Sequence, residues 1–466
     1  MITFSKDFLW GAAASAPQTE GAALIDGKSP TVWDKWFELE PELFYEGVGP
    51  EQTSNTYYQY KEDVALMKKM ELNSYRTSIS WARILPDGKA VNLKAVQFYR
   101  DYFQEMKANG IEPIINLFHF DMPWWLMEKG GWETRESIEA FAFYAQVVFE
   151  QFGDIIKKWT TFNEPLVHVE CGYLGEAHYP KVVDFTRAIQ VGYHTLLAHA
   201  MAVNRYKNSK YNDGEIGIIL NLSPVYPKSP HVEDEKAAHI TDLIYIKSFL
   251  DTVVHGYFPE ELIQLFKTHQ LLPRVEEEDK KIFQRNIVDF LGVNYYQPLR
   301  VQRPKKEQFP AQFPSAFASH YDWPNKKINP YRGWEIYPEG IYDLGMRLKN
   351  EYKNISWYVS ENGMGVSEEE RFLDESGVVQ DSYRIDFLKE HLIMLQKAIS
   401  EGSNCFGYHM WTFVDCWSWL NAYKNRYGFY RIDLENQFKR LEKASSLWLK
   451  QVIVENGFPM TDERKK

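Results

Sequence analysis

The strongest constraint on the fold is a regular alternation of short apolar runs with amphipathic segments along the chain. Eight apolar runs are predicted as buried strands, and segments with helical spacing separate them. The predicted strands cover residues 8–15, 72–80, 111–119, 156–164, 215–222, 288–296, 357–361 and 405–415. Such alternation predicts a parallel α/β sheet. Because no linker, repeat or low-complexity tract interrupts it, we expect one catalytic domain over residues 1–466, a (β/α)8 TIM barrel with elaborated βα loops.

The composition narrows the class of protein. The 466 residues are 44% hydrophobic, enough for a large core, and α/β barrels often run to this length as one domain. A net charge of −11 argues against a nucleic-acid partner. No apolar stretch is long enough to span a bilayer and no signal peptide is evident, so we expect a cytoplasmic protein without a membrane partner. The sequence leaves a homo-oligomer possible.

Polar residues interrupt the strand pattern at or near the predicted C-terminal ends of different strands. In a parallel barrel these ends form the rim where active sites lie. We therefore expect the following residues to gather around one site: Gln18, Arg76, His119, Asn163, Glu164, Asn294, Glu361 and Trp411.

Two of these rim residues, Glu164 and Glu361, suit glycoside hydrolysis, which uses a pair of carboxyl groups. Arg76 would keep a neighbouring carboxylate ionised, as a nucleophile requires, whereas burial and a negative partner would keep the other acid protonated. We assign Glu361 as the nucleophile and Glu164 as the acid/base. The alternative is a structural pair, with each acid bridged to a basic side chain.

The other rim residues fit a sugar site without a cofactor. Asn163 and His119 can bind sugar hydroxyls and Trp411 can stack on a sugar face, although each type of residue is also common in cores. The His119-Phe120-Asp121 run does not suggest a metal site, because neighbours on a strand alternate faces. The sequence has no Gly-rich phosphate loop. We expect neither a metal nor a cofactor.

Several motifs in order resemble glycoside hydrolase family 1, the retaining β-glycosidases, over almost the whole chain. They are FLWGAAASAPQTEGA, YRTSISWARILP, FHFDMP, TFNEP and SENG. The resemblance implies Glu164 as acid/base and Glu361 as nucleophile. It implies Arg76 and Tyr296 beside the nucleophile, where we also expect Asn294. Around the sugar it implies Gln18, His119, Asn163, Trp411 and Trp419.

The run WTFVDCWSWLNAYKNRYG, residues 411–428, resembles the branch of the family that acts on 6-phosphosugars. Members acting on unmodified sugars carry Glu where this chain has Ser418. A carboxylate would repel a phosphate, whereas the hydroxyl groups of Ser418 and Tyr427 and the ammonium of Lys424 would donate hydrogen bonds to it. The phosphate-binding lysine normally stands at the position of Asn425. Either Lys424 reaches the phosphate, or Asn425 donates instead, or Lys424 and Arg426 form a solvated loop face.

These observations predict a sugar-phosphate substrate and hydrolysis of 6-phospho-β-glucosides by double displacement. Three alternatives stay open. The substrate could be a 6-phospho-β-galactoside, or the enzyme could accept both 6-phospho-β-glucosides and 6-phospho-β-galactosides, since these two epimers differ only at the fourth hydroxyl. It could be an unphosphorylated β-glucoside. The barrel could also bind sugar without turnover, although both acids are present.

Overall fold

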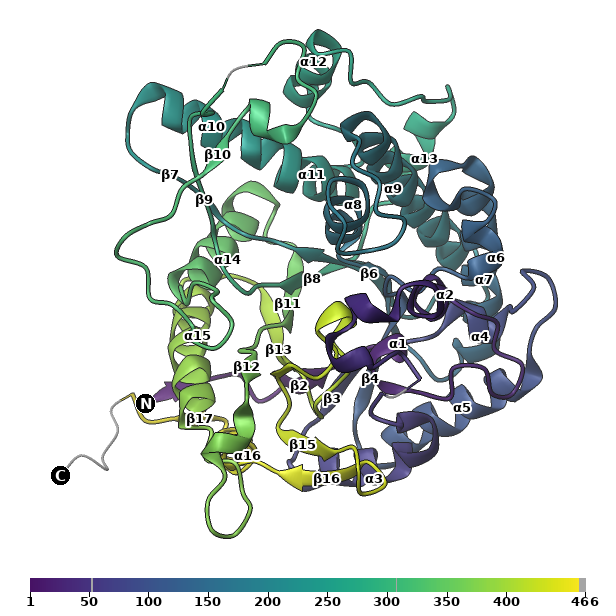
Figure 1. The fold of residues 1–466 in the computed structure, drawn as a ribbon, viewed down its shortest axis with the longest axis vertical. Helices are drawn as coiled ribbons and strands as arrows, with labels where there is room; N and C mark the ends of the chain where they lie inside the picture. Colours follow the sequence, from purple (N-terminus) through teal and green to yellow (C-terminus); the bar gives the residue numbers. More distant parts are fainter. Residues whose placement is uncertain (52, 307, 461–466) are drawn as a thin grey trace.

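A closed barrel of eight parallel strands forms the centre of the computed structural model, which describes residues 1–51, 53–306 and 308–460. Around the barrel the strand order is β11-β13-β2-β3-β4-β5-β6-β8 (Figure 1). The strands are β2 (Leu9–Ala13), β3 (Ser74–Ser78), β4 (Glu112–Phe118), β5 (Lys158–Asn163), β6 (Glu215–Asn221), β8 (Phe290–Asn294), β11 (Ser356–Glu361) and β13 (Cys405–Trp411). The predicted fold class is therefore confirmed.

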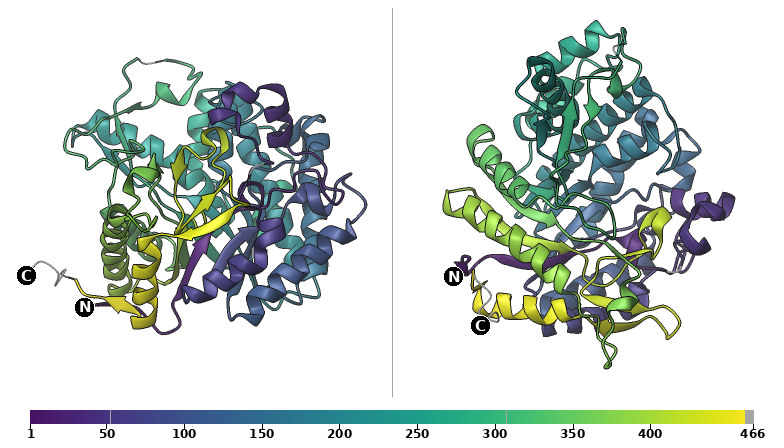
Figure 2. Two further views of the ribbon diagram at one scale, coloured as in Figure 1. Left: turned by 60° about the horizontal axis from the view of Figure 1, so that its bottom comes forward. Right: turned by 60° about the vertical axis from the view of Figure 1, so that its left-hand side comes forward.

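Helices cover the outside of the barrel (Figures 1 and 2). The main ones are α3 (Thr56–Lys69), α5 (Leu93–Ala108), α7 (Arg135–Phe152), α9 (Phe185–Lys207), α11 (Ser248–His255), α14 (Glu339–Glu351), α15 (Ser382–Ser400) and α16 (Ala444–Glu455). Helix α7 shows why they pack there. Its apolar residues recur at helical spacing, and Ile138, Phe141 and Val148 on that face are buried.

Two regions of the structure depart from a simple alternation of strands and helices. Residues 232–255 form α10 (Val232–Asp242), a π-helical turn (Leu243–Lys247) and α11. The chain between β8 and α14 contains β9 (Leu299–Gln302), which pairs with β7 (Val225–Pro227) and β10 (Ser319–His320). These three strands are too short to show a period in the sequence, so only their tertiary pairing reveals them.

Short elements above the barrel complete the site. Helix α8 (Pro165–Tyr173) follows β5 directly, and the turn η7 (Trp419–Asn421) lies beyond β13. Strand β12 (Val366–Ser367) pairs with β14 (Asn425–Arg426), and β15 (Tyr430–Asp433) pairs with β16 (Lys439–Glu442). Among the described residues, no helix is both long and apolar enough to cross a membrane.

Candidate active site

The two predicted catalytic acids stand where their strands end. Glu361 is the last residue of β11 and pairs in register with Asn294 at the end of β8. Glu164 follows β5 and precedes Pro165, the first residue of α8. Its φ of 46° lies in the left-handed region, which is uncommon for a residue with a side chain and is often found at functional sites. Both carboxyl groups therefore belong to the C-terminal rim of the barrel.

Both oxygens of the Glu361 carboxylate accept hydrogen bonds from residues predicted to support it. The guanidinium of Arg76 donates to Oε1 and also forms an ion pair with this carboxylate. The hydroxyl of Tyr296 donates to Oε2 at 2.6 Å. Arg76 is fixed in turn, because it is completely buried and donates to the carbonyl of Ala14 at 3.0 Å. Glu361 is thus held rigidly by two donors, as an attacking carboxylate needs to be.

Glu164 lies in a different electrostatic environment. Burial, and then the negative charge of Glu361, raise the pKa of Glu164 to about 8, and a hydrogen bond from Asn294 and the charge of Arg76 oppose the shift. Glu164 therefore carries its proton at neutral pH, as a general acid must. The environments separate the roles of the two acids in the direction that the sequence predicts.

The side chain of Asn294 contacts a different acid from the one that we expected it to support. Asn294 pairs in register with Glu361, but its Nδ2 donates to Oε1 of Glu164 at 2.9 Å. The same Nδ2 lies 3.1 Å from Oδ1 of Asn163, and Oδ1 of Asn294 accepts a hydrogen bond from Ser360 at 2.6 Å. Ser360 and Asn163 thus fix the amide of Asn294 so that its donor faces the acid/base. Which carboxyl group it contacts depends on side-chain orientation at the strand end, which the sequence does not show.

The predicted sugar-binding residues form one polar and aromatic group. His119 places Nε2 3.4 Å from Nδ2 of Asn163, and its ring stacks on Trp411 with centroids 6.0 Å apart. Burial lowers the pKa of His119 well below its usual value, so this ring is neutral. Among the described residues its Nδ1 has no hydrogen-bond partner. A neutral ring can donate or accept, as hydroxyl recognition requires.

Trp419 and Gln18 extend this group. Trp419 stacks on Trp33 with ring centroids 4.5 Å apart, and its ring lies 6.0 Å from that of His119. Gln18, on helix α1 (Ala16–Thr19), donates to the carbonyl of Trp417 at 2.9 Å and so ties the chain after β2 to the segment carrying Trp419. The sequence analysis did not single out Trp33. Trp33 lies on helix α2 (Val32–Leu39), and its contact with Trp419, almost 400 residues away, cannot be seen in the sequence.

The four predicted phosphate-binding residues do not all face the same way. Tyr427 and Asn425 are buried and Ser418 is half-buried. Residues 425 and 427 are two apart on an extended segment, so they present their side chains on the same side. Lys424 is exposed, and its ammonium lies over the ring of Tyr45, 5.6 Å from the centroid. The structure therefore does not bring Lys424 together with Tyr427.

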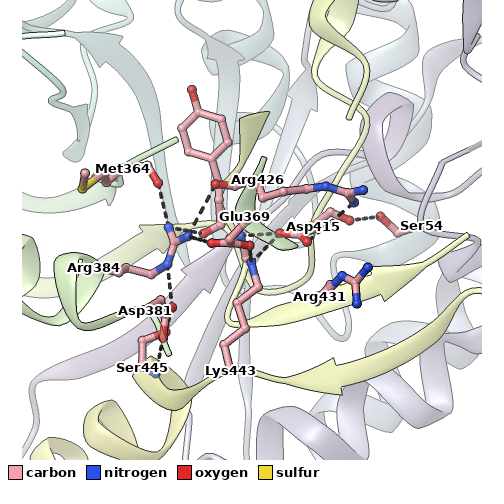
Figure 3. Close-up of polar contacts among 12 residues, drawn as sticks. Ser54, Met364, Glu369, Asp381, Arg384, Asp415, Arg426, Arg431, Lys443 and Ser445 are labelled. Carbon is pink, nitrogen blue, oxygen red and sulfur yellow. Dashed lines mark hydrogen bonds and ion pairs between the residues drawn. The ribbon is translucent and has the colours of Figure 1, made fainter. Parts of the chain in front are cut away.

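A buried cluster of charges anchors the segment that carries Tyr427 (Figure 3). Arg384 donates to the carbonyl groups of Met364, at 2.7 Å, and Tyr427, at 3.1 Å. Arg384 pairs with Glu369 at 2.6 Å and Asp381 at 2.9 Å. The cluster thus joins the chain just beyond the nucleophile strand to the chain beyond β13.

Lys443 extends the same cluster, because it pairs with Glu369 and, at 3.0 Å, with Asp415. Asp415 accepts from the backbone N–H of Gly428 at 2.9 Å, and its carbonyl accepts from the Ser54 hydroxyl at 2.8 Å. Every member is enclosed by protein, so the backbone around Tyr427 has little freedom.

Other features of the described residues do not provide a competing site. Among them no group of three or more His, Cys, Asp or Glu side chains could hold a metal ion. An apolar cavity of about 350 Å³ lies between α8, α9 and α11, lined by residues such as Val169, Leu196 and Phe249. It lacks the paired acids that hydrolysis needs.

Comparisons with known proteins agree with this geometry. Residues 1–458 match the model of Glycosyl hydrolase family 1. The chain is 52% identical to 6-phospho-beta-glucosidase GmuD of Bacillus subtilis, over 98% of each chain, and 35% identical to 6-phospho-beta-galactosidase of Clostridium acetobutylicum, again over 98% of each. Among solved structures, the family 1 β-glucosidase from Thermotoga maritima superposes with a TM-score of 0.90 at 34% identity, covering 98% of this chain and 99% of that one.

Proposed function

The chain belongs to glycosyl hydrolase family 1, and on that premise we propose that it is a retaining β-glycosidase that hydrolyses 6-phospho-β-glucosides. The observation that carries the proposal is the unequal pair of acids. Glu361 is held by Arg76 and Tyr296, whereas the pKa of Glu164 is raised to about 8 by burial and by the charge of Glu361. One acid is thus arranged to attack and the other to donate a proton.

The reaction then follows in two displacements. The carboxylate of Glu361 attacks the anomeric carbon while Glu164 donates its proton to the departing oxygen, which gives a glycosyl ester on Glu361. Esterification removes the charge of Glu361, so the pKa of Glu164 falls and its carboxylate can accept a proton from water. That water attacks the anomeric carbon, releases the sugar with its β configuration and restores Glu361.

Three observations support a phosphate on the sugar. Ser418 stands where relatives acting on unmodified sugars are expected to carry Glu, so no carboxylate repels a phosphate there. Tyr427 offers a second hydroxyl donor on a fixed backbone. GmuD, at 52% identity, is named a 6-phospho-beta-glucosidase. A sugar phosphate is charged and does not cross a membrane unaided, so we place the reaction in the cytoplasm, where such sugars would be phosphorylated.

A second candidate function is the hydrolysis of 6-phospho-β-galactosides by the same two displacements. The 6-phospho-beta-galactosidase of Clostridium acetobutylicum is 35% identical to this chain over 98% of each. Because the epimers differ only at the fourth hydroxyl, one enzyme can accept both.

Four nitrophenyl substrates test the proposal: the β-glucoside and the β-galactoside, each with and without the 6-phosphate. We expect kcat/KM to be highest for 6-phospho-β-glucoside and the first-formed sugar to be the β anomer by NMR. Equal or faster turnover of the unphosphorylated glucoside would refute the phosphate specificity. A preference for the galacto epimer would favour the second candidate.

A further inference from the structure

We infer that Arg332, in the loop between β10 and α14, binds the 6-phosphate of the substrate and supplies the positive charge of that subsite. This inference rests on the proposed function and adds a specificity-determining residue to it. The guanidinium of Arg332 lies over the ring of Trp334, 4.6 Å from the centroid. Trp334 in turn contacts Tyr296 edge-on at 5.4 Å. Arg332 is therefore two side chains away from the nucleophile, since Tyr296 donates to Glu361.

Arg332 is also next to Tyr427. Burial raises the pKa of Tyr427, and the positive charge of Arg332 opposes that shift more than any other group does. The geometry agrees, because Gly365, whose carbonyl accepts a hydrogen bond from Asn329 of the Arg332 turn, lies directly against the phenol ring of Tyr427. Arg332 and Tyr427 are 95 residues apart in the chain, and together they bring a cation and a hydroxyl donor to one place.

A tight turn fixes the position of Arg332. The backbone N–H of Asn329 donates to the carbonyl of Trp334, and the backbone N–H of Gly333 donates to the carbonyl of Asn329, both at 2.8 Å. Gly333 has a φ of 82°, which favours glycine at that point of the turn. The side chain of Asn329 donates to the carbonyl of Gly365 at 2.9 Å, just beyond the nucleophile strand. The turn is therefore attached to the catalytic rim.

The guanidinium has unused binding capacity. Its Nε is buried and has no hydrogen-bond partner among the described residues, and within the same residues no carboxylate lies at ion-pair distance from Arg332. A buried, unpaired donor of this kind costs free energy unless a ligand satisfies it. Stacking on Trp334 leaves the edge of the guanidinium available for a planar pair of hydrogen bonds.

The other cations around Tyr427 are already neutralised (Figure 3). Arg384 pairs with Glu369 and Asp381, and Lys443 pairs with Glu369 and Asp415.

The three remaining basic residues nearby do not compete either. Arg426 lies 3.6 Å from Asp415 and 3.9 Å from Glu370, Arg431 lies 3.6 Å from Glu370, and Lys424 points to Tyr45.

A phosphate monoester fits this environment because it carries a charge of about −1.5 to −2 at pH 7 and accepts several hydrogen bonds. In a protein with a net charge of −11, it needs a local cation. Asn425 brings no charge, so Arg332 is the side chain that provides it. Guanidinium and phosphate groups pair in bidentate fashion, which orients the sugar as well as attracting it.

The test compares nitrophenyl β-glucoside 6-phosphate with nitrophenyl β-glucoside in wild type, Arg332→Met, Arg332→Lys and Lys424→Met. Arg332→Met keeps the bulk of the side chain and removes the charge. We expect it to lower kcat/KM for the phosphorylated substrate by roughly 10- to 100-fold, mainly through KM, with the unphosphorylated substrate nearly unchanged. Arg332→Lys should retain part of the preference. Lys424→Met, the matched control on the neighbouring loop, should change neither rate.

A rescue variant separates a binding role from a structural one. Because residues 425 and 427 face the same side, Asn425→Lys in the Arg332→Met background should restore part of the preference for the phosphate. Equal losses on both substrates, or no loss on the phosphorylated one, would overturn the role of Arg332 while leaving the proposed function intact. The wild-type comparison is separate, because a wild type that does not prefer the phosphate refutes the proposed function itself.

Discussion

Removing the charge of Glu361 should lower the pKa of Glu164 by a predictable amount. Burial comes first among the causes that raise this pKa to about 8, and the charge of Glu361 comes second. Glu361→Gln removes the second cause and keeps the shape of the side chain. It also leaves the buried guanidinium of Arg76 without its partner, and that charge acts in the same direction.

The magnitude follows from Coulomb's law. Retaining glycosidases place their two carboxyl groups about 5–5.5 Å apart, and at an effective dielectric constant of about 20 two unit charges at that distance repel by about 3 kcal/mol. This energy corresponds to about 2 pKa units. We therefore expect the pKa of Glu164 to fall from about 8 to about 6 in Glu361→Gln.

The assay is a 13C NMR titration of carboxyl-labelled glutamate, with the spectrum of Glu164→Gln identifying the resonance. Circular dichroism checks that Glu361→Gln is folded. In the wild type, the basic limb of kcat/KM should fall at the same pKa of about 8, because only protonated Glu164 can act as the acid. A pKa that stays within half a unit of its wild-type value would show that burial alone sets it, and would refute the close pairing of the two acids.

Three further results are expected. Glu361→Gly should abolish turnover, and added azide should restore it by attacking from the vacated face, giving the α-glycosyl azide; a β product would mean that the removed residue is the acid/base. Lys443→Met should lower the free energy of unfolding by about 3–5 kcal/mol in chemical denaturation, because it leaves Glu369 and Asp415 buried with one cation fewer. Lys69→Met, which removes an exposed ion pair, should lower it by at most about 1 kcal/mol. Similar losses in the two variants would contradict the role of burial. The free energy of unfolding should fall as the pH drops below about 6.5, because burial keeps five histidines neutral in the native state, with a pKa of about 3 or 4, whereas the same histidines bind protons in the unfolded chain. Each histidine should cost up to about 1.4 kcal/mol per pH unit, and a flat profile in urea titrations would refute this. The five histidines are His168, His178, His199, His391 and His409.

The sequence predicts the barrel and its rim because both depend on local patterns. Apolar runs that end on polar residues mark the strands, and closing the barrel brings those ends together whatever the details. Glu164, Glu361 and Arg76 could be placed in one site for this reason, and the family resemblance added Tyr296. The observed hydrogen bonds of Arg76 and Tyr296 to Glu361 agree with this placement.

Side-chain direction at the rim does not follow from local pattern. Asn294 could face either carboxyl group, and the hydrogen bond from Ser360 decides the matter. Lys424 looked suitable because it adjoins Asn425, but it lies at a bend before β14 and its ammonium lies over the ring of Tyr45. Arg332 lies 95 residues before Tyr427, and only the folded turn at residues 329–334 brings the two together.

The buried charge cluster around Arg384 has a consequence for how substrate preference can change. It fixes the main chain at Met364 and at Tyr427, on either side of the proposed phosphate subsite, by hydrogen bonds from Arg384 to backbone carbonyl groups. Replacing side chains that line the subsite leaves these bonds in place. New preferences can then arise by exchanging single side chains on a constant frame, with no loop needing to be rebuilt. A mutant library aimed at positions 332, 418 and 425 should therefore yield many folded enzymes with altered selectivity, whereas one aimed at the cluster should yield mostly unfolded chains.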